Sequence, residues 1–350
     1  MKWLKRFGIV VVVILVLAGG AGAVMELRSP KARPIDAAKK FEATPERIAR
    51  GKYIVEAQTH CLFCHSDHEW GTHGAPIVPG MTGAGWDIPY AENKMPGRVF
   101  APNITPDPET GIGGLPDDAI ARAIREGVGH DGRALFMMPS KHFRNLSDEE
   151  VASIVVFLRT LAPVKKQREL TQIQIPVRWF MKFGPKPLTA PVPEADASDP
   201  VARGKHLAEI GLCTECHTPV NERHEPLPGM AFGGGQDFTL GGVKYRSANI
   251  TPHASGLAHY DEALFIKTMR TGNIGGRRLS PVMPFTEVGK LTDADLKALW
   301  AFLKTVPPVA HDVERAPVEV KDNPAINEHP EVAAAGGVPP VGGAEKAAAP

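Results

Sequence analysis

All four cysteines of this chain lie in two short segments that share one pattern. The segments are Cys61-Leu62-Phe63-Cys64-His65 and Cys213-Thr214-Glu215-Cys216-His217. On a helix this spacing puts two thiols about one turn apart, where both can add to the vinyl groups of one porphyrin while the histidine faces the iron. The pattern is typical of covalent haem c attachment, and its duplication predicts two haems in one chain.

Paired cysteines also serve other chemistries. A redox dithiol, half of a zinc site, or a disulfide in an exported protein would each account for one such pair. A redox dithiol needs no following histidine, and zinc ligands are expected to lie closer together in sequence than these two segments. The duplicated pattern with its histidines therefore favours haem over these alternatives.

The first residues of the chain carry an export signal. A basic start is followed by an uncharged run, Phe7–Met25, of 25 − 7 + 1 = 19 residues rich in Val, Ile and Leu. This run is long enough to span a membrane, although Ala21-Gly22-Ala23 also fits the small-residue pattern of a cleavage site. Residues 1–25 are therefore predicted to be a signal peptide or a transmembrane anchor, with the anchor slightly favoured, and the rest is expected on the periplasmic side.

Composition sets broad limits on the function. The 350 residues can form two small domains, and 43% hydrophobic content can supply their cores. The formal charge is +1, from 40 basic and 39 acidic residues, so no overall field attracts nucleic acid or an acidic substrate. We therefore expect no nucleic-acid partner.

Beyond the leader, the chain contains an internal repeat. Matched segments keep their order in both copies: Arg50-Gly51-Lys52 with Arg203-Gly204-Lys205, Asn103-Ile104-Thr105-Pro106 with Asn249-Ile250-Thr251-Pro252, Met138-Pro139 with Met283-Pro284, and residues 145–164 with residues 290–309. The repeat predicts two domains, residues 44–163 and 198–309, called here the first and second repeat. Residues 164–197 are then an interdomain linker.

Each repeat is predicted to begin with a helix. Thr44-Pro45 and Asp199-Pro200 each combine an N-cap residue with proline at the first helical position. Gly51 and Gly204 fall inside these helices, where glycine is costly unless another element approaches the backbone closely. We therefore expect a second helix to cross each of them.

The other predicted elements are also helical. A capping box at Ser147 and a matching start at Thr292 open the last helix of each repeat. Middle helices are predicted over Asp117–Glu126 and Asp261–Thr271, each ending at a glycine. No strand pattern competes with these signals, so the predicted fold class is all-α.

The remaining segments are predicted to be irregular. Gly71–Gly97 and Gly229–Gly242 are interpreted as glycine-rich loops that can fit closely around a flat macrocycle. The linker is proline-rich and contains the apolar, basic stretch Val177–Phe183, which we interpret as packed between domains in preference to contact with a membrane surface or a partner. Residues 310–350 are rich in Ala, Pro and Gly and are predicted to be a disordered tail.

The sixth position of each iron decides between electron transfer and catalysis. Met138 and Met283 are the candidate ligands because both precede a proline and lie nine residues before a helix cap, at Ser147 or Thr292. Met81 and Met230 form a second matched pair and remain the alternative. A thioether ligand raises the reduction potential and closes the coordination sphere, so such iron passes single electrons.

From about Thr44 to Val309 the chain resembles a tandem class I cytochrome c. More narrowly, it resembles the membrane-associated cytochrome c subunits of bacterial alcohol, aldehyde and sugar-acid dehydrogenases. The two haem motifs, the stretch Ala101–Gly113 and the two Met-Pro pairs carry the resemblance. It implies short helices around each of two haems, with attachments and axial ligands Cys61, Cys64, His65, Met138, Cys213, Cys216, His217 and Met283. Those dehydrogenase subunits usually carry three haem motifs, whereas this chain has two.

The resemblance also implies a function. It implies electron delivery from a periplasmic donor, such as a dehydrogenase, to a respiratory acceptor such as a terminal oxidase or another cytochrome. The main hypothesis is a dihaem carrier without catalytic residues, at the outer face of the cytoplasmic membrane or in the periplasm if the leader is cleaved. The alternative is a dihaem enzyme such as a cytochrome c peroxidase, or the cytochrome subunit of an oxidising dehydrogenase.

Overall fold

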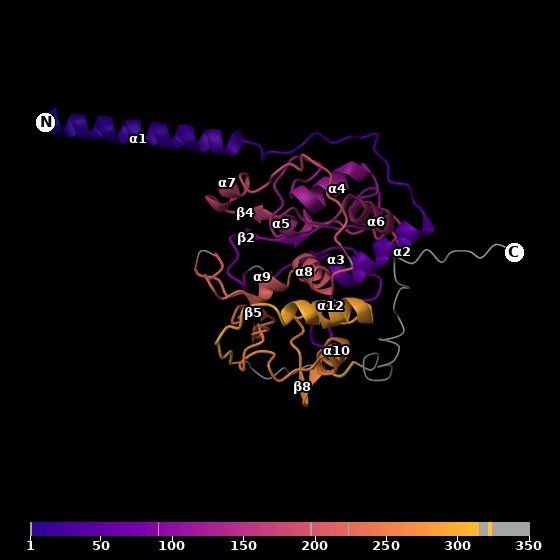
Figure 1. The fold of residues 1–350 in the computed structure, drawn as a ribbon. Coiled ribbons are helices and arrows are strands. Elements are labelled where there is room, and N and C mark those ends of the chain that lie inside the picture. Colours follow the sequence, from indigo (N-terminus) through magenta and orange to yellow (C-terminus); the bar gives the residue numbers. More distant parts are fainter. Residues whose placement is uncertain (1, 90, 197, 223, 315–320, 324–350) are drawn as a thin grey trace.

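A long N-terminal helix stands apart from the rest of the molecule (Figure 1). The computed structural model describes residues 2–89, 91–196, 198–222, 224–314 and 321–323. Helix α1 (Lys2–Leu27) has no buried residue, and it is long and apolar enough to cross a membrane. The predicted apolar N-terminal helix is thus confirmed.

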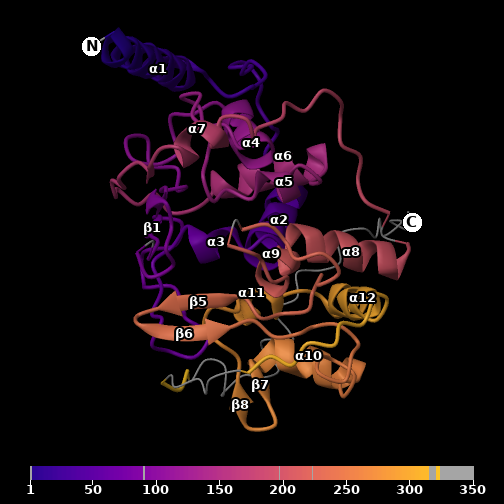
Figure 2. The same cartoon turned by 90° about the vertical axis from the view of Figure 1, so that its left-hand side faces the viewer.

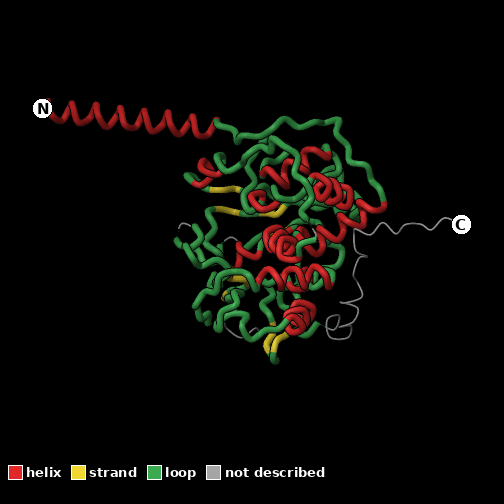
Figure 3. Tube along the Cα trace, viewed as in Figure 1, coloured by secondary structure: helices red, strands yellow, loops and turns green. Residues whose placement is uncertain are grey.

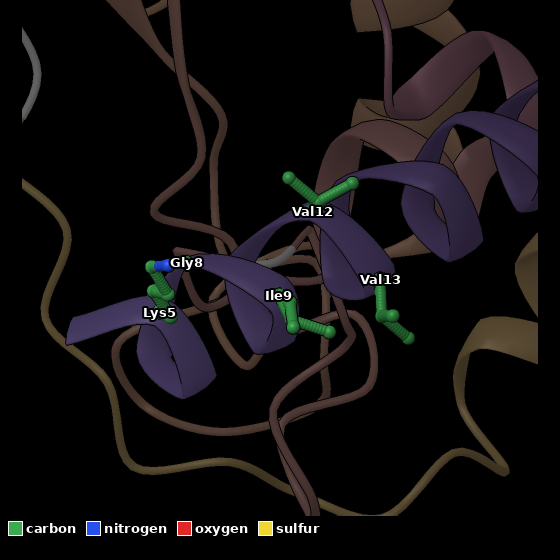
Figure 4. Close-up of a pocket in the computed structure, with 5 residues that line it drawn as sticks. All are labelled: Lys5, Gly8, Ile9, Val12 and Val13. Carbon is green, nitrogen blue, oxygen red and sulfur yellow. The ribbon is translucent and has the colours of Figure 1, made fainter. Parts of the chain in front are cut away.

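A hollow runs along the outer side of α1. It is lined by Lys5, Gly8, Ile9, Val12 and Val13 (Figure 4). This stretch of α1 lies far from the helices that carry the cysteines (Figure 1). The hollow is therefore a feature of an isolated apolar helix and takes no part in the haem sites.

The two repeats contain the same series of helices. In the first they are α2 (Pro45–Tyr53), the π-helix η1 (Ile54–Gln58), α3 (Cys61–Cys64), α4 (Asp117–Glu126), α5 (Ser140–Phe143) and α6 (Asp148–Leu158). In the second they are α8 (Pro200–Ile210), α9 (Cys213–His217), α10 (Glu262–Thr271), α11 (Phe285–Val288) and α12 (Asp293–Leu303). The predicted helix starts are confirmed: the hydroxyls of Thr44 and Thr292 and the carboxylate of Asp199 each accept from a first-turn backbone N–H, and Ser147 forms the full capping box with Glu150.

The first and last helices of each repeat cross at a glycine. A Cβ on Gly51 would overlap the carbonyl oxygen of Ser153 in α6, and a Cβ on Gly204 would overlap that of Ala298 in α12. The α2–α6 and α8–α12 packings are the two largest helix contacts among the described residues. Glycine is required here for close approach of two backbones, as the sequence predicts.

Two hydrophobic clusters form the main cores, and each cluster includes side chains from the other repeat. The first is built on α6 residues such as Val151 and Ile154, and it includes Ile210 from the second repeat. The second is built on α12 residues such as Leu296, and it includes Tyr53 from the first repeat. The repeats are therefore packed together through shared apolar side chains.

The structure also contains short strands, so the all-α prediction is incomplete (Figure 3). The antiparallel pairs among the described residues are β1 (Trp86–Asp87) with β3 (Phe100–Ala101), β2 (Gly97–Arg98) with β4 (Gln172–Ile173), β5 (Asp237–Leu240) with β6 (Val243–Arg246), and β7 (Asn273–Ile274) with β8 (Arg277–Arg278). The predicted loops were wrong where Gly71–Gly97 includes β1 and the first residue of β2, and where Gly229–Gly242 includes β5. Gly241 and Gly242, both with positive φ, form the tight turn that a two-residue hairpin needs.

The segment between the repeats packs on the first repeat. It contains β4 and helix α7 (Val177–Met181). Ile173, Val177 and Met181 join a third apolar cluster with residues such as Val99. Figure 2 shows α7 on the same side of the molecule as α1.

Most of the predicted tail, residues 310–350, lies outside the described residues. Within it, Lys321 forms two backbone hydrogen bonds of 2.9 Å, to Gly71 and His73. A short described part of the tail therefore lies against the loop that follows the first cysteine segment.

Candidate haem sites

Both cysteine segments are entered through a left-handed residue. His60 (φ 53°) precedes Cys61 at α3, and Leu212 (φ 60°) precedes Cys213 at α9. Neither residue is glycine, so each conformation costs on the order of 1 kcal/mol and is held by its surroundings. The same strained backbone conformation thus precedes the cysteine helix in both repeats and sets the direction in which that helix begins.

The first repeat reaches its cysteines through one additional residue. Gly51 and Cys61 are 61 − 51 = 10 positions apart, whereas Gly204 and Cys213 are 213 − 204 = 9 apart. The π-helix η1 lies in this interval, and Thr59 N donates to Ile54 O at 2.9 Å. A π-turn holds one more residue than an α-turn, so η1 absorbs the insertion between the helix crossing and the cysteines.

The two histidines are held by the same backbone contact. His65 Nδ1 lies 2.8 Å from Pro102 O, and His217 Nδ1 lies 2.7 Å from Ala248 O. A carbonyl oxygen only accepts, so Nδ1 carries the proton in each ring. Nε2 of the neutral ring is then left with a free lone pair, which is the arrangement that metal-ligating histidines use.

Burial favours the neutral form of both rings. It lowers the pKa of His65 and of His217 below the ordinary value, against a smaller raising effect of the hydrogen bonds to Pro102 and Ala248. Each imidazole is therefore uncharged at neutral pH, with Nε2 able to bind iron without first losing a proton.

A buried asparagine fixes the loop that carries each acceptor carbonyl. Asn103 follows Pro102 directly and donates from Nδ2 to Val164 O at 2.7 Å; Asn249 follows Ala248 and donates to Val309 O at 2.8 Å. Their side-chain oxygens accept from the following threonines in the same way in both repeats. The repeated Asn-Ile-Thr-Pro segment thus ties the histidine's partner to the segment that follows the last helix. The recurrence of this segment in the sequence indicates a role but does not say which.

The cysteines are free thiols; Cys64 is exposed and the other three are partly exposed, although each sulfur has many protein atoms around it. Burial raises the pKa of Cys61, that of Cys64 to about 11, and those of Cys213 and Cys216 to about 12. No described group of three or more His, Cys, Asp and Glu side chains gathers as it would around a metal ion. Free thiols beside an imidazole with a free Nε2 fit a thioether-bound haem, and the described residues do not gather the four ligands of a zinc site.

The candidate axial methionines lie at the same cores as the cysteines. Met138 and Cys61 both pack against the first hydrophobic cluster, and Met283 and Cys213 both pack against the second. Met81, of the alternative pair, instead has its sulfur 3.7 Å from Lys166 Nζ. Met138 and Met283 thus each share an apolar cluster with the first cysteine of their own repeat, whereas Met81 contacts a lysine.

The two sites adjoin each other. Glu215, between the cysteines of the second segment, accepts from Lys141 Nζ and His142 Nε2 of α5 in the first repeat, both at 2.7 Å. Burial is the main cause of the raised pKa of Cys216, and the nearby Cys64 of the other segment adds to it. The two cysteine segments are therefore close in space.

Comparison with known proteins agrees with this geometry. Residues 46–158 match the family model described as cytochrome C oxidase, cbb3-type, subunit III. The cytochrome c subunit of the quinone alcohol dehydrogenase of Gluconobacter oxydans is 30% identical over 297 residues, which are 78% of this chain and 57% of that subunit. The chain is similar to c-type cytochromes.

Two further relatives define the extent of this similarity. The fructose dehydrogenase cytochrome subunit of Gluconobacter japonicus is 28% identical, over 74% of this chain and 52% of the relative. A dihaem c-type cytochrome of Cereibacter sphaeroides is 27% identical, over 84% of this chain and 96% of the relative. The chain thus spans little more than half of the two dehydrogenase subunits and nearly all of the dihaem cytochrome.

Proposed function

We propose that this chain is a dihaem c-type electron carrier, in which residues 44–163 and 198–309 each form a class I cytochrome c domain. The observation that carries the proposal is the matched anchoring of His65 and His217, whose Nδ1 atoms bond to Pro102 O and Ala248 O and leave Nε2 free. When bound, each haem c supplies an iron that accepts and releases one electron.

Eight residues hold the two haems in this proposal. They are the thioether attachments Cys61, Cys64, Cys213 and Cys216, the proximal ligands His65 and His217, and the distal ligands Met138 and Met283. The shared packing of each methionine and the first cysteine of its repeat on one apolar cluster supports the distal pair. With both axial positions filled by protein, no iron is open to substrate, which favours a carrier over a peroxidase.

Relatives and the N-terminal helix support the partners and the location. The named relatives include cytochrome c subunits of alcohol, fructose and gluconate dehydrogenases. We propose that the donor is a periplasmic dehydrogenase and that the acceptor is a respiratory component such as a terminal oxidase or another cytochrome. Helix α1, which is long and apolar enough to span a bilayer, would hold the carrier at the periplasmic face of the cytoplasmic membrane.

Redox titration of methionine variants tests the proposal. Met138→Ala and Met283→Ala are each expected to lower the potential of one haem by about 0.1 V or more, since axial ligation sets potentials over a range of about 0.8 V. The other haem should keep its potential in each variant. Met81→Ala and Met230→Ala are the matched controls and should leave both potentials in place.

Other results would support the alternative ligand pair or the alternative function. A fall in potential with Met81→Ala or Met230→Ala would move the distal ligands to that pair. Peroxide turnover by the unmodified, fully haem-loaded protein would replace the carrier with a dihaem peroxidase.

A further inference from the structure

Exposed apolar side chains gather in one segment of the globular part. Outside α1, four of the eight large apolar side chains exposed among the described residues lie within residues 170–183. They are Leu170 (60% exposed), Ile175 (53%), Phe180 (66%) and Phe183 (50%). The other four are scattered over both repeats, so this segment is the apolar patch that needs a partner.

Helix α7, in this segment, is apolar on two sides. Val177 and Met181 are one helical turn apart and pack against the cluster that contains Val99 and Ile173. Phe180 and, just beyond the helix, Phe183 remain exposed. The inner face of α7 is already packed on the core. Packing within the protein therefore does not explain why the outer face, with Phe180, is apolar as well.

The segment is bonded to the end of the membrane-length helix. Trp179 Nε1 donates to the Glu26 carboxylate at 2.9 Å, and its ring lies 3.3 Å from where a Cβ on Gly22 would stand. Lys182 Nζ donates to the carbonyls of Met25 and Glu26, at 3.0 and 2.7 Å, and so caps the C-terminal end of α1. Both views show α7 beside this end of α1 (Figures 1 and 2).

Basic side chains accompany one end of the patch. The Arg28 guanidinium lies 4.3 Å from the centre of the Phe183 ring, and Lys31 and Lys186 are exposed nearby in sequence. Tryptophan, exposed phenylalanine and basic residues at the end of an apolar span are the composition of the interface between lipid headgroups and acyl chains. The chemistry of the patch therefore matches an anionic phospholipid surface.

We infer that residues 170–183 lie in the outer headgroup region of the membrane, with Phe180 and Phe183 directed into the lipid, so that α7 docks the first repeat on the bilayer. The inference rests on the proposed anchoring by α1. It adds a second contact, which limits how the first repeat is oriented at the membrane surface.

Spin labels measure this contact directly. In the haem-loaded chain the native cysteines are held in thioethers, so a single introduced cysteine can be labelled with a nitroxide. Phe180→Cys and Ile175→Cys are placed in phosphatidylethanolamine–phosphatidylglycerol vesicles with the irons kept reduced. Both labels are expected to collide several-fold less with a water-soluble nickel chelate, and more with oxygen, than a label at the matched control Val201→Cys. Val201 is an exposed apolar residue (37%) on α8, and both views show α8 away from α1.

Two failures are distinguishable by intact mass and vesicle sedimentation. Suppose α1 is present, the protein sediments with vesicles, and the Phe180 and Ile175 labels collide with nickel as often as the Val201 label. Lipid contact by α7 is then overturned while the anchored carrier stands. If the mature chain instead lacks residues 1–23 and stays in solution, the anchored location fails and the lipid contact fails with it.

Discussion

The two repeats agree at their candidate haem sites and differ where they face each other. Both use a glycine crossing, a left-handed entry, a histidine bonded to a carbonyl, and an asparagine that fixes the carbonyl's loop. The second residue between the cysteines is not shared: the Phe63 and Trp70 rings meet edge to face, with ring centres 5.4 Å apart, whereas Glu215 pairs with Lys141 and His142. The comparison indicates that the residues that position the histidine are kept in both repeats, whereas the side chains around each candidate site can differ.

Two contacts between the repeats use equivalent positions but different residue types. Tyr53 and His206 occupy equivalent positions, since 206 − 53 = 153 as for Gly204 and Gly51. Tyr53 Oη donates to Asp295 at 2.7 Å, and His206 Nε2 lies 3.3 Å from Glu150. Each first helix thus contacts the last helix of the other repeat. Only Asp295 also binds an arginine, Arg203 of its own repeat, so the two acidic residues differ in their partners.

The largest expected effect tests the shared framework. Gly51→Ala and Gly204→Ala should each lower the free energy of unfolding by about 3 kcal/mol or more, because the added Cβ meets a backbone oxygen that cannot move without separating two helices. Denaturant unfolding followed by circular dichroism measures the loss. Gly71→Ala is the control, since nothing lies near its Cβ position. A loss below about 1 kcal/mol in one repeat only would show that the helices there do not depend on close approach.

The next prediction compares Asp295 and Glu150, the acidic residues that receive the two contacts between repeats. Arg203 donates to both oxygens of Asp295, at 2.9 Å each, and the two side chains are 18% and 12% exposed. Asp295→Asn should therefore cost about 2–3 kcal/mol at pH 7, because it leaves the guanidinium half-buried without its counter-charge. Glu150→Gln should cost less, about 1 kcal/mol, since its partner is a histidine at longer distance and glutamine keeps the capping box.

The pH dependence of this difference has a definite sign. Burial of Asp295 opposes ionisation, but Arg203, Tyr53 and Gln58 outweigh it and hold the pKa below the ordinary value of 3.8. Its contribution is therefore complete above pH 3.8 and is lost as the pH falls through the lower folded pKa. The gap between wild type and Asp295→Asn should stay constant from pH 7 to 5 and narrow below about pH 4. A gap that persists unchanged to pH 3 would mean that the carboxylate charge is not what stabilises the contact.

An effect smaller than that of Asp295→Asn is expected in the asparagine loops. Asn103 and Asn249 are 3% and 4% exposed, so Asn103→Ala and Asn249→Ala should each cost about 1–2 kcal/mol through buried carbonyl and amide groups left unpaired. Each substitution should also shift the potential of the haem in its own repeat alone, as followed by redox titration. A shift in the haem of the other repeat would contradict the assignment of each asparagine to one histidine.

Local chemistry explains which parts of this fold were predictable. Caps such as Ser147 and Thr44 act within one turn, and a mid-helix glycine such as Gly51 marks a crossing, so these features are readable without tertiary structure. The β5–β6 hairpin also had a local signal, Gly241-Gly242 between strand-forming residues, which the all-α prediction overlooked. The π-helix at Ile54–Gln58 follows only when the two repeats are aligned and the additional residue is counted.

Other features depend on partners that carry no sequence signature. The acceptors of His65 and His217 are backbone carbonyls, and any residue can supply a carbonyl. The Tyr53–Asp295 contact joins residues 242 positions apart. For the same reason the contact between α7 and α1 was not foreseen, although the basic, apolar composition of Val177–Phe183 was recognised.

The central claim is that this chain holds two haems in matched sites. A pyridine haemochrome assay on protein matured with a haem-attachment system measures it directly when combined with the protein concentration. The expected result is two haems per chain, falling to one when both cysteines of either segment are replaced by alanine. One haem per unmodified chain, or none, would contradict the account.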